Sequence, residues 1–213
     1  MQNRQEDPIT IAIRKNTSQA EDWALSELAS RLYEWIDIFN AELFKDQPIK
    51  VPVISFEKTR VNTLGKYKSG RNAFGVMESI NLNRVHLNRP FADILSTLLH
   101  EMTHSWQVAF GRSSNSWFHN KEFQAKLKRF GISCDNKGCH MSVEDPFVSL
   151  LKRHGISFDQ KADSKGMIEV APFPNGKSKL KKWQCFCGQK ARVGKKEFYA
   201  TCDLCIHKFK YVP

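Results

Sequence analysis

The run HEMTH at residues 100–104 constrains this chain more than any other feature, because it has the form H-E-x-x-H inside an apolar sequence of helical period. His100 and His104 are four residues apart, so on a helix their imidazoles project from one face and can bind one metal ion. Glu101 follows the first histidine directly and can activate a metal-bound water. The spacing therefore predicts a helix that supports zinc-assisted hydrolysis.

The apolar residues around this motif indicate a helix with one buried side. They recur at helical spacing: Leu95, Leu98, Leu99, Met102 and Trp106. Pro90 suits the first turn of such a helix. The alternative is a purely structural histidine pair on a charged, solvated face. A buried helix with two imidazoles and a carboxylate needs partners for them, however, and a metal supplies one.

A catalytic zinc usually takes three protein ligands and keeps a fourth position for water, so another donor must come from elsewhere in the chain. Among the seven histidines, His119 is the best candidate. It begins the next predicted helix, residues 117–130, after a connector just long enough to fold back over the first helix. Glu122, one turn further on, is either an alternative ligand or a group that orients His119.

The remaining patterns predict a mixture of helices and short strands. Isoleucines at alternate positions in residues 9–13 favour a strand. Ser18 with Glu21 has the form of a capping box for a long amphipathic helix, whose apolar stripe runs over residues 25–43. Further strands are expected at residues 51–56, 63–68 and 74–82. The 213 residues suit one α+β domain, with helices packed on a small antiparallel or mixed sheet, and a small appendage.

The C-terminal tail contains C-x-C-G at residues 185–188 and C-x-x-C at residues 202–205. Two close thiolate pairs separated by a hairpin-length segment can close a tetrahedral structural zinc site. The predicted ligands are Cys185, Cys187, Cys202 and Cys205. Free thiols are the alternative, but a stretch this short cannot bury a sufficient core alone, and metal binding would drive its folding.

The net charge of +11 is concentrated in this tail, since residues 176–213 contain ten Lys and Arg against two acidic residues. Aromatic residues are interleaved with the lysines, and such a surface can hold phosphates and stack on the bases of single-stranded nucleic acid. A merely solvated face is the alternative. The predicted contacts are Lys179, Lys181, Lys182, Lys190, Arg192, Lys195, Lys196, Lys208 and Lys210. Arg60, Lys66, Lys68 and Arg71 can extend the basic surface.

A looser group lies between the motif and the tail. Cys134, Cys139 and His140, with His154 as a fourth donor, have the composition of a second structural metal site. The spacing is loose, and free thiols in a loop are the simpler interpretation. The N-terminus has no apolar segment of a signal peptide, and no apolar run approaches the ~18–20 residues of a spanning helix. We therefore expect a cytoplasmic, nucleoid-associated or nuclear protein without a membrane partner.

Residues 97–104, TLLHEMTH, followed by HNKEF at residues 119–123, resemble the SprT-like zinc metalloprotease family of the Spartan type, which carries a C-terminal zinc ribbon. That family has H-E-x-x-H and then a third histidine in an H-G-x-x-F context. Asn120 stands where the family has Gly, and Asn also tolerates a left-handed backbone. The resemblance covers about residues 18–130 and the tail.

The resemblance implies a zincin-like domain in which His100, His104 and His119 bind a catalytic zinc and Glu101 is the catalytic base. It implies a zinc-dependent endopeptidase that acts on DNA-associated or DNA-crosslinked proteins, with DNA, including single-stranded DNA, as a partner. The peptide would lie along an edge strand, for which residues 74–82 are the choice. Tyr67 and His86 are candidates for stabilising the oxyanion.

The resulting domain organisation has four parts. They are an N-terminal strand or arm at residues 1–17, a SprT-like metalloprotease domain at 18–156, a linker at 157–180 and a zinc ribbon at 181–213. One alternative is a nucleic-acid-binding zinc-ribbon protein with a vestigial or narrowly specific regulatory peptidase domain. Another is a zinc peptidase whose tail recognises protein rather than nucleic acid. The sequence does not indicate an oligomeric state.

Overall fold

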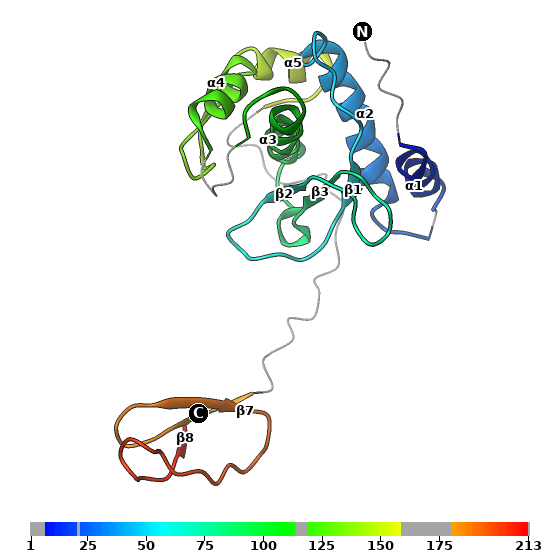
Figure 1. The fold of residues 1–213 in the computed structure, drawn as a ribbon. Coiled ribbons are helices and arrows are strands. Elements are labelled where there is room, and N and C mark those ends of the chain that lie inside the picture. The colour runs from blue at the N-terminus through cyan, green and yellow to red at the C-terminus, as the bar shows by residue number, and fades with distance from the viewer. Residues whose placement is uncertain (1–6, 21, 114–118, 159–179, 213) are drawn as a thin grey trace. The chain divides into compact units, whose positions relative to one another are not determined.

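The computed structural model describes residues 7–20, 22–113, 119–158 and 180–212. The chain divides into two units, Met1–Val170 and Ala171–Pro213 (Figure 1), and each is described by itself. The first unit contains five helices and two small sheets among its described residues, and the second contains one three-stranded sheet. The α+β class predicted from the sequence is confirmed. The predicted domain limits stay predictions, and the linker lies outside the described residues apart from residues 157, 158 and 180.

The N-terminal segment is a helix, α1 (Pro8–Gln19), so the strand predicted from its alternating isoleucines is wrong. Asp7 caps this helix, because its carboxylate accepts the backbone N–H of Thr10 at 3.2 Å. Pro8 occupies the first helical position, where its missing N–H costs nothing. The two-residue period does not create a buried face, since Ile11 is exposed.

Helix α2 (Ser26–Glu42) begins later than the predicted capping box. Ser18 belongs to α1, Glu21 lies outside the described residues, and no side chain caps the start of α2. The apolar stripe itself is confirmed, because its residues from Leu28 to Phe39 are buried. They form one side of the hydrophobic core of the first unit.

The first sheet consists of β1 (Val53–Ser55), β2 (Gly65–Lys68) and β3 (Ser79–Leu82), in the order β1-β3-β2. β1 runs parallel to β3, and β2 runs antiparallel to it. The strand predicted at residues 74–82 is therefore too long, and its assignment as the edge is wrong, since β3 is central. The Asn72 side chain accepts the N–H groups of Phe74 and Val76, which holds the preceding residues in a turn. β2 is the edge strand beside the motif helix.

Helix α3 (Phe91–Phe110) carries the H-E-x-x-H motif, as predicted, and Gly111 is its C-cap. It lies between the sheet and helices α2 and α4 (Figure 1). Almost every residue from Phe91 to Gln107 is buried, including the polar ones. Buried polar groups need hydrogen-bond partners, so the elements packed around α3 must provide partners for its polar side chains. The short 3₁₀ helix Arg84–His86 leads into α3.

Helix α4 (Lys121–Arg129) begins later than the predicted residue 117, and residues 117 and 118 lie outside the described ones. It is followed by a hairpin of β4 (Ile132–Cys134) and β5 (His140–Val143), then by helix α5 (Phe147–Arg153). The hairpin is antiparallel and its register shifts near Cys134. Among the described helices, none is long and apolar enough to cross a membrane.

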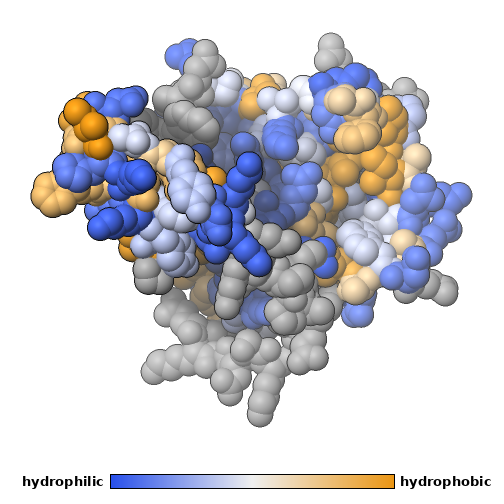
Figure 2. Space-filling view, turned by 90° about the horizontal axis from the view of Figure 1, so that it is seen from below, coloured by the Kyte–Doolittle hydropathy of each residue, from blue (hydrophilic) through white to orange (hydrophobic). Residues whose placement is uncertain are grey.

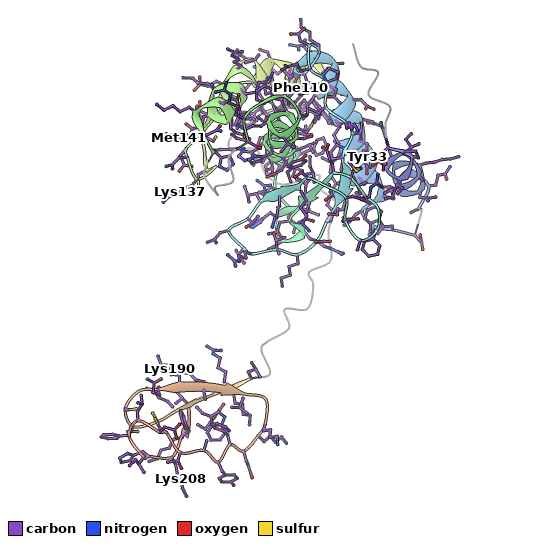
Figure 3. The ribbon with its side chains drawn as sticks, in the orientation of Figure 1. Tyr33, Phe110, Lys137, Met141, Lys190 and Lys208 are labelled. Carbon is purple, nitrogen blue, oxygen red and sulfur yellow. The ribbon has the colours of Figure 1, made fainter. Side chains whose placement is uncertain are left out.

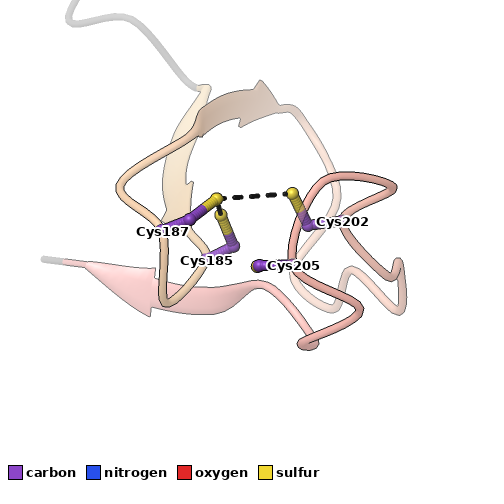
Figure 4. A group of neighbouring side chains, drawn as sticks. All are labelled: Cys185, Cys187, Cys202 and Cys205. Carbon is purple, nitrogen blue, oxygen red and sulfur yellow. Dashed lines mark hydrogen bonds between the residues drawn. The ribbon is translucent and has the colours of Figure 1, made fainter.

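The second unit is an antiparallel sheet of β6 (Lys181–Gln184), β7 (Lys190–Val193) and β8 (Lys210–Val212), with β6 in the centre. Its small core is aromatic. The rings of Trp183 and Phe198 lie 5.7 Å apart, and those of Phe198 and Phe209 lie 5.8 Å apart. Four cysteines lie in the loops beside this sheet (Figure 4).

We expect Phe39→Ala to destabilise the first unit strongly. Phe39 is fully buried on α2, with its ring 5.4 Å from Trp35 and 6.3 Å from Phe147. Truncation leaves a cavity, for which about 3–5 kcal/mol of unfolding free energy is lost. Chemical denaturation measures the loss. The exposed Glu34→Ala on the same helix is the matched control, and equal stabilities of the two variants would contradict the assignment of Phe39 to the core.

Candidate metal centre

His100 and His104 lie one turn apart on α3, with ring centroids 5.2 Å from each other. His100 is buried, and His104 is half-buried. The helix fixes their relation, since residues at i and i+4 share a face. Phe123 of α4 packs against both rings, at centroid distances of 5.0 and 4.3 Å.

His119 lies just before α4, and it completes a three-histidine group. Its Nε2 is 2.9 Å from Nε2 of His100 and 3.0 Å from Nε2 of His104. The backbone N–H of His119 donates to the carbonyl of Asn136 at 2.8 Å, which ties it to the β4–β5 hairpin. Helix α3 and the turn before α4 thus bring three like nitrogens together, as ligand counting predicted. The metal-binding role of these residues stays a prediction.

The donor set fits zinc. A tetrahedral zinc with bonds of 2.0–2.1 Å to nitrogen separates two such ligands by roughly 3.3 Å, close to the spacing of these nitrogens. Burial, followed by the neighbouring imidazoles, lowers the pKa of His100, and burial with His119 lowers the pKa of His104 to about 3. Burial also lowers the pKa of His119. The rings are therefore neutral at pH 7, the form that a metal requires.

Glu101 contacts the edge strand β2. It is 5 % exposed, and its Oε2 accepts the Tyr67 N–H of β2 at 2.8 Å. Burial raises the pKa of Glu101 to about 8, and the Tyr67 N–H opposes that rise. A Cβ at Gly65 would lie 2.8 Å from Glu101 Oε1, so the absence of a side chain at that position leaves room for the carboxylate.

The predicted oxyanion candidates have other partners. The Tyr67 hydroxyl donates to Glu78 Oε2 at 3.0 Å, and the Ser105 hydroxyl donates to the same oxygen at 2.7 Å. Burial and the charge of Glu78 raise the pKa of Tyr67. His86 Nε2 lies 2.6 Å from the carbonyl of Val61. An oxyanion role for either residue stays a prediction.

Glu122 does not join the histidine group, so its assignment as an alternative ligand is wrong. Its Oε2 accepts the Arg112 N–H at 2.7 Å and the Gln107 amide at 3.1 Å, at the end of α3. Asn120 has φ −71°, so a left-handed backbone is not the reason that Asn is tolerated there. Its side chain caps α4 by accepting the Phe123 N–H at 3.0 Å, and it also accepts from Gln107 at 2.7 Å.

His140 lies beside the centre, although the sequence pattern grouped it with two cysteines. Its Nε2 is 3.2 Å from Nδ1 of His100. His154 instead pairs with Glu42, and Cys134 is buried in the core. Within the described part of the chain, the donor groups that can hold a metal are the three histidines and the four tail cysteines, so a second site at Cys134 is not supported.

The four tail cysteines lie together (Figure 4). Their sulfurs are within 4.8 Å of one another, with Cys185 and Cys187 3.1 Å apart and Cys187 and Cys202 3.7 Å apart. The His207 N–H lowers the pKa of Cys205 to about 6, while the neighbouring thiols raise that of Cys187 to about 12. All four can ionise together when a cation compensates them, and such a set of thiolates fits structural zinc.

The predicted nucleic-acid contacts lie in the second unit, except that Lys179 is outside the described residues. Lys190 and Lys208 extend from opposite sides of this unit (Figure 3). Trp183 and Phe198 are half-buried and belong to the core, whereas Phe186 and Tyr199 are 83 % and 86 % exposed. The Phe186 ring stacks on His207, with centroids 5.0 Å apart. Arg60, Lys66, Lys68 and Arg71 are exposed in the first unit. Hydrophilic residues cover much of the face in Figure 2, with smaller hydrophobic groups among them.

Three imidazoles on a buried helix and the following turn, beside an edge strand in an α+β unit, define a zinc metallopeptidase-type domain. The SprT-like family model matches residues 32–145, more than half of the chain, and the protein belongs to the SprT-like family. The SprT-like domain has a zincin-like fold, and it is generally a metallopeptidase domain. No curated protein matches the chain.

The imidazole pKa values predict how stability depends on pH in the metal-free chain. Four buried rings, those of His100, His104, His119 and His140, have pKa values below the ordinary 6.5 when folded. Below pH 6.5 the unfolded state therefore binds more protons, and the free energy of unfolding falls on acidification towards pH 4.5. The raised pKa of Glu101 has the opposite effect on the free energy of unfolding in this window, but it is one group against four imidazoles.

Chemical denaturation of the protein, stripped of metal by a chelator, at a series of pH values across this window measures how the free energy of unfolding depends on pH. His104→Gln removes one of the four rings, so it should make the dependence shallower. Stability that stays constant or rises on acidification would contradict the neutral, buried state of the imidazoles.

Proposed function

We propose that this protein is a zinc-dependent endopeptidase that acts on DNA-associated or DNA-crosslinked proteins. The proposal is carried by the position of His119 Nε2, 2.9 and 3.0 Å from Nε2 of His100 and His104, on the helix that also holds Glu101 against the edge strand β2. When bound by His100, His104 and His119, zinc supplies Lewis-acid polarisation of a carbonyl and acidifies water. The family membership supports the peptidase class, and we infer the substrate class from the resemblance to the Spartan type together with the charge of the tail.

Glu101 is the base in this proposal. It follows a proposed ligand on the same helix, and it is the one buried carboxylate in the described part of the chain. Its pKa falls when a divalent cation lies at the imidazoles, because an opposite charge favours the carboxylate. Glu101 then takes a proton from water and passes it to the leaving amine.

The peptide substrate binds along β2 in this proposal. β2 is an edge strand, and the Tyr67 N–H points away from the sheet towards Glu101. Edge strands bind extended peptides through main-chain hydrogen bonds. A peptide that pairs with the free edge of β2 therefore runs alongside the strand whose Tyr67 N–H contacts Glu101.

The second unit supplies the DNA affinity. Its residues from 176 onwards have a net charge of +8, and a zinc with four thiolates leaves about +6. Exposed Phe186 and Tyr199 suit stacking on the bases of single-stranded DNA. DNA binding would place the protein at the nucleoid or in the nucleus, with protein substrates and without a membrane partner.

A second candidate is a nucleic-acid-binding protein whose peptidase domain is vestigial or specific for one regulatory substrate. The environment of Glu101 favours it, because the Tyr67 N–H already occupies one carboxylate oxygen and a pKa of about 8 leaves the group protonated at neutral pH. Cleavage of a DNA-binding protein with and without single-stranded DNA separates the two candidates.

We expect Glu101→Gln to keep zinc but lose cleavage. The amide retains the shape of the side chain and cannot accept a proton, and general acid–base groups contribute about 10²–10⁴-fold to rates. Metal content and DNA-stimulated proteolysis measure the two properties. Glu144→Gln removes an exposed charge elsewhere in the unit and should cleave normally. Normal proteolysis by the Glu101 variant would refute its role.

We also expect DNA affinity to depend steeply on salt. Each lost phosphate contact lowers the slope of log K against log salt by about 0.7 for single strands. Lys190→Ala and Lys208→Ala should each reduce the slope, whereas Lys137→Ala on the β4–β5 turn should not. Fluorescence anisotropy with a labelled oligonucleotide gives the slopes, and a flat salt profile for the unchanged protein would count against phosphate contacts.

A further inference from the structure

The β4–β5 hairpin contacts two of the three histidines of the metal centre. The carbonyl of Asn136 accepts the backbone N–H of His119 at 2.8 Å, and a Cβ at Gly138, where φ is +85°, would lie 2.4 Å from the His119 ring. On the adjoining strand, His140 Nε2 lies 3.2 Å from His100 Nδ1. The hairpin therefore packs directly against the rings that carry the proposed function.

The two nitrogens of His100 have different partners. Nε2 faces the other two imidazoles, and Nδ1 faces His140. A neutral imidazole has one N–H, so Nε2 offers a lone pair to a metal only when the hydrogen is on Nδ1. Metal-binding histidines usually donate that hydrogen to an acceptor, which fixes both the tautomer and the ring orientation.

His140 is placed to be this acceptor rather than another ligand. Its Nε2 approaches the far nitrogen of His100, and it is not among the donors that converge at the centre. For Nε2 to accept the hydrogen of His100, the hydrogen of the His140 ring must be on its own Nδ1.

The hairpin has a backbone irregularity that aims His140. Ser133 pairs with Ser142, but Cys134 pairs with His140, so Met141 is an extra residue on β5. Such bulges commonly re-aim a neighbouring side chain. Met141 is 74 % exposed and lies at the outer edge of the unit (Figure 3), while His140 is half-buried beside His100.

We propose that His140 is a positioning residue for the metal centre: its Nε2 accepts the Nδ1–H of His100, which holds His100 with Nε2 directed at the metal. The inference rests on the proposed function, because it requires zinc at the three histidines. His140 acts through His100 and does not touch the substrate.

Zinc affinity of the full chain tests the proposal, measured by competition with a graded series of chelators. The cysteine site serves as an internal reference, since its four ligands belong to the second unit and His140 belongs to the first. His140→Phe keeps a ring but removes the acceptor, and we expect about 10–100-fold weaker zinc binding at the histidine centre. His140→Gln places an amide oxygen near the position of Nε2 and should recover most of the affinity. Met141→Ala, on the same bulge, should bind as the unchanged chain does.

Cobalt(II) in place of zinc gives a second readout. The visible spectrum of the histidine centre should change in the Phe variant and be restored in the Gln variant. Unchanged affinity in the Phe variant would overturn the proposal, as would equal weakening in the Phe and Gln variants, which would indicate packing rather than hydrogen bonding. If the wild-type protein binds zinc only at the cysteines, that result would instead contradict the proposed function.

Discussion

The burial of helix α3 is the constraint on which the rest of the first unit depends. Its polar side chains lie inside the core, where each needs a partner. Ser105 donates to Glu78, Gln107 donates to Asn120, and Glu101 accepts from β2. The imidazoles of His100 and His104 differ, because their Nε2 atoms face Nε2 of His119 rather than a hydrogen-bond partner of another residue type. A metal resolves that arrangement, so the core packing and the proposed chemistry have the same origin.

Local patterns in the sequence predicted what is determined locally. The helical periods of α2 and α3 and the close cysteine pairs depend on residues near one another in the chain. The alternating isoleucines at residues 9–13 are misleading, since Asp7 and Pro8 begin a helix just before them. The order of strands was also missed, because sheet order is set by contacts between distant segments.

The same distinction applies to the metal centre. His119 was within reach of ligand counting, because the motif helix and a short connector limit the donors. His140 was not, since its contact with His100 spans forty positions and depends on a bulge that no spacing rule reveals. The sequence shows that Asn120 departs from the family pattern, but only the structure shows that this residue caps α4.

The missing side chain at Gly65 has a consequence for the placement of the base. Helix α3 and strand β2 approach each other so closely at this point that an added Cβ would lie 2.8 Å from Glu101 Oε1 and 2.9 Å from Thr97 Cγ2. Any larger residue would therefore have to displace the strand or the carboxylate. The position of this glutamate is thus determined from the neighbouring strand as well as from its own helix.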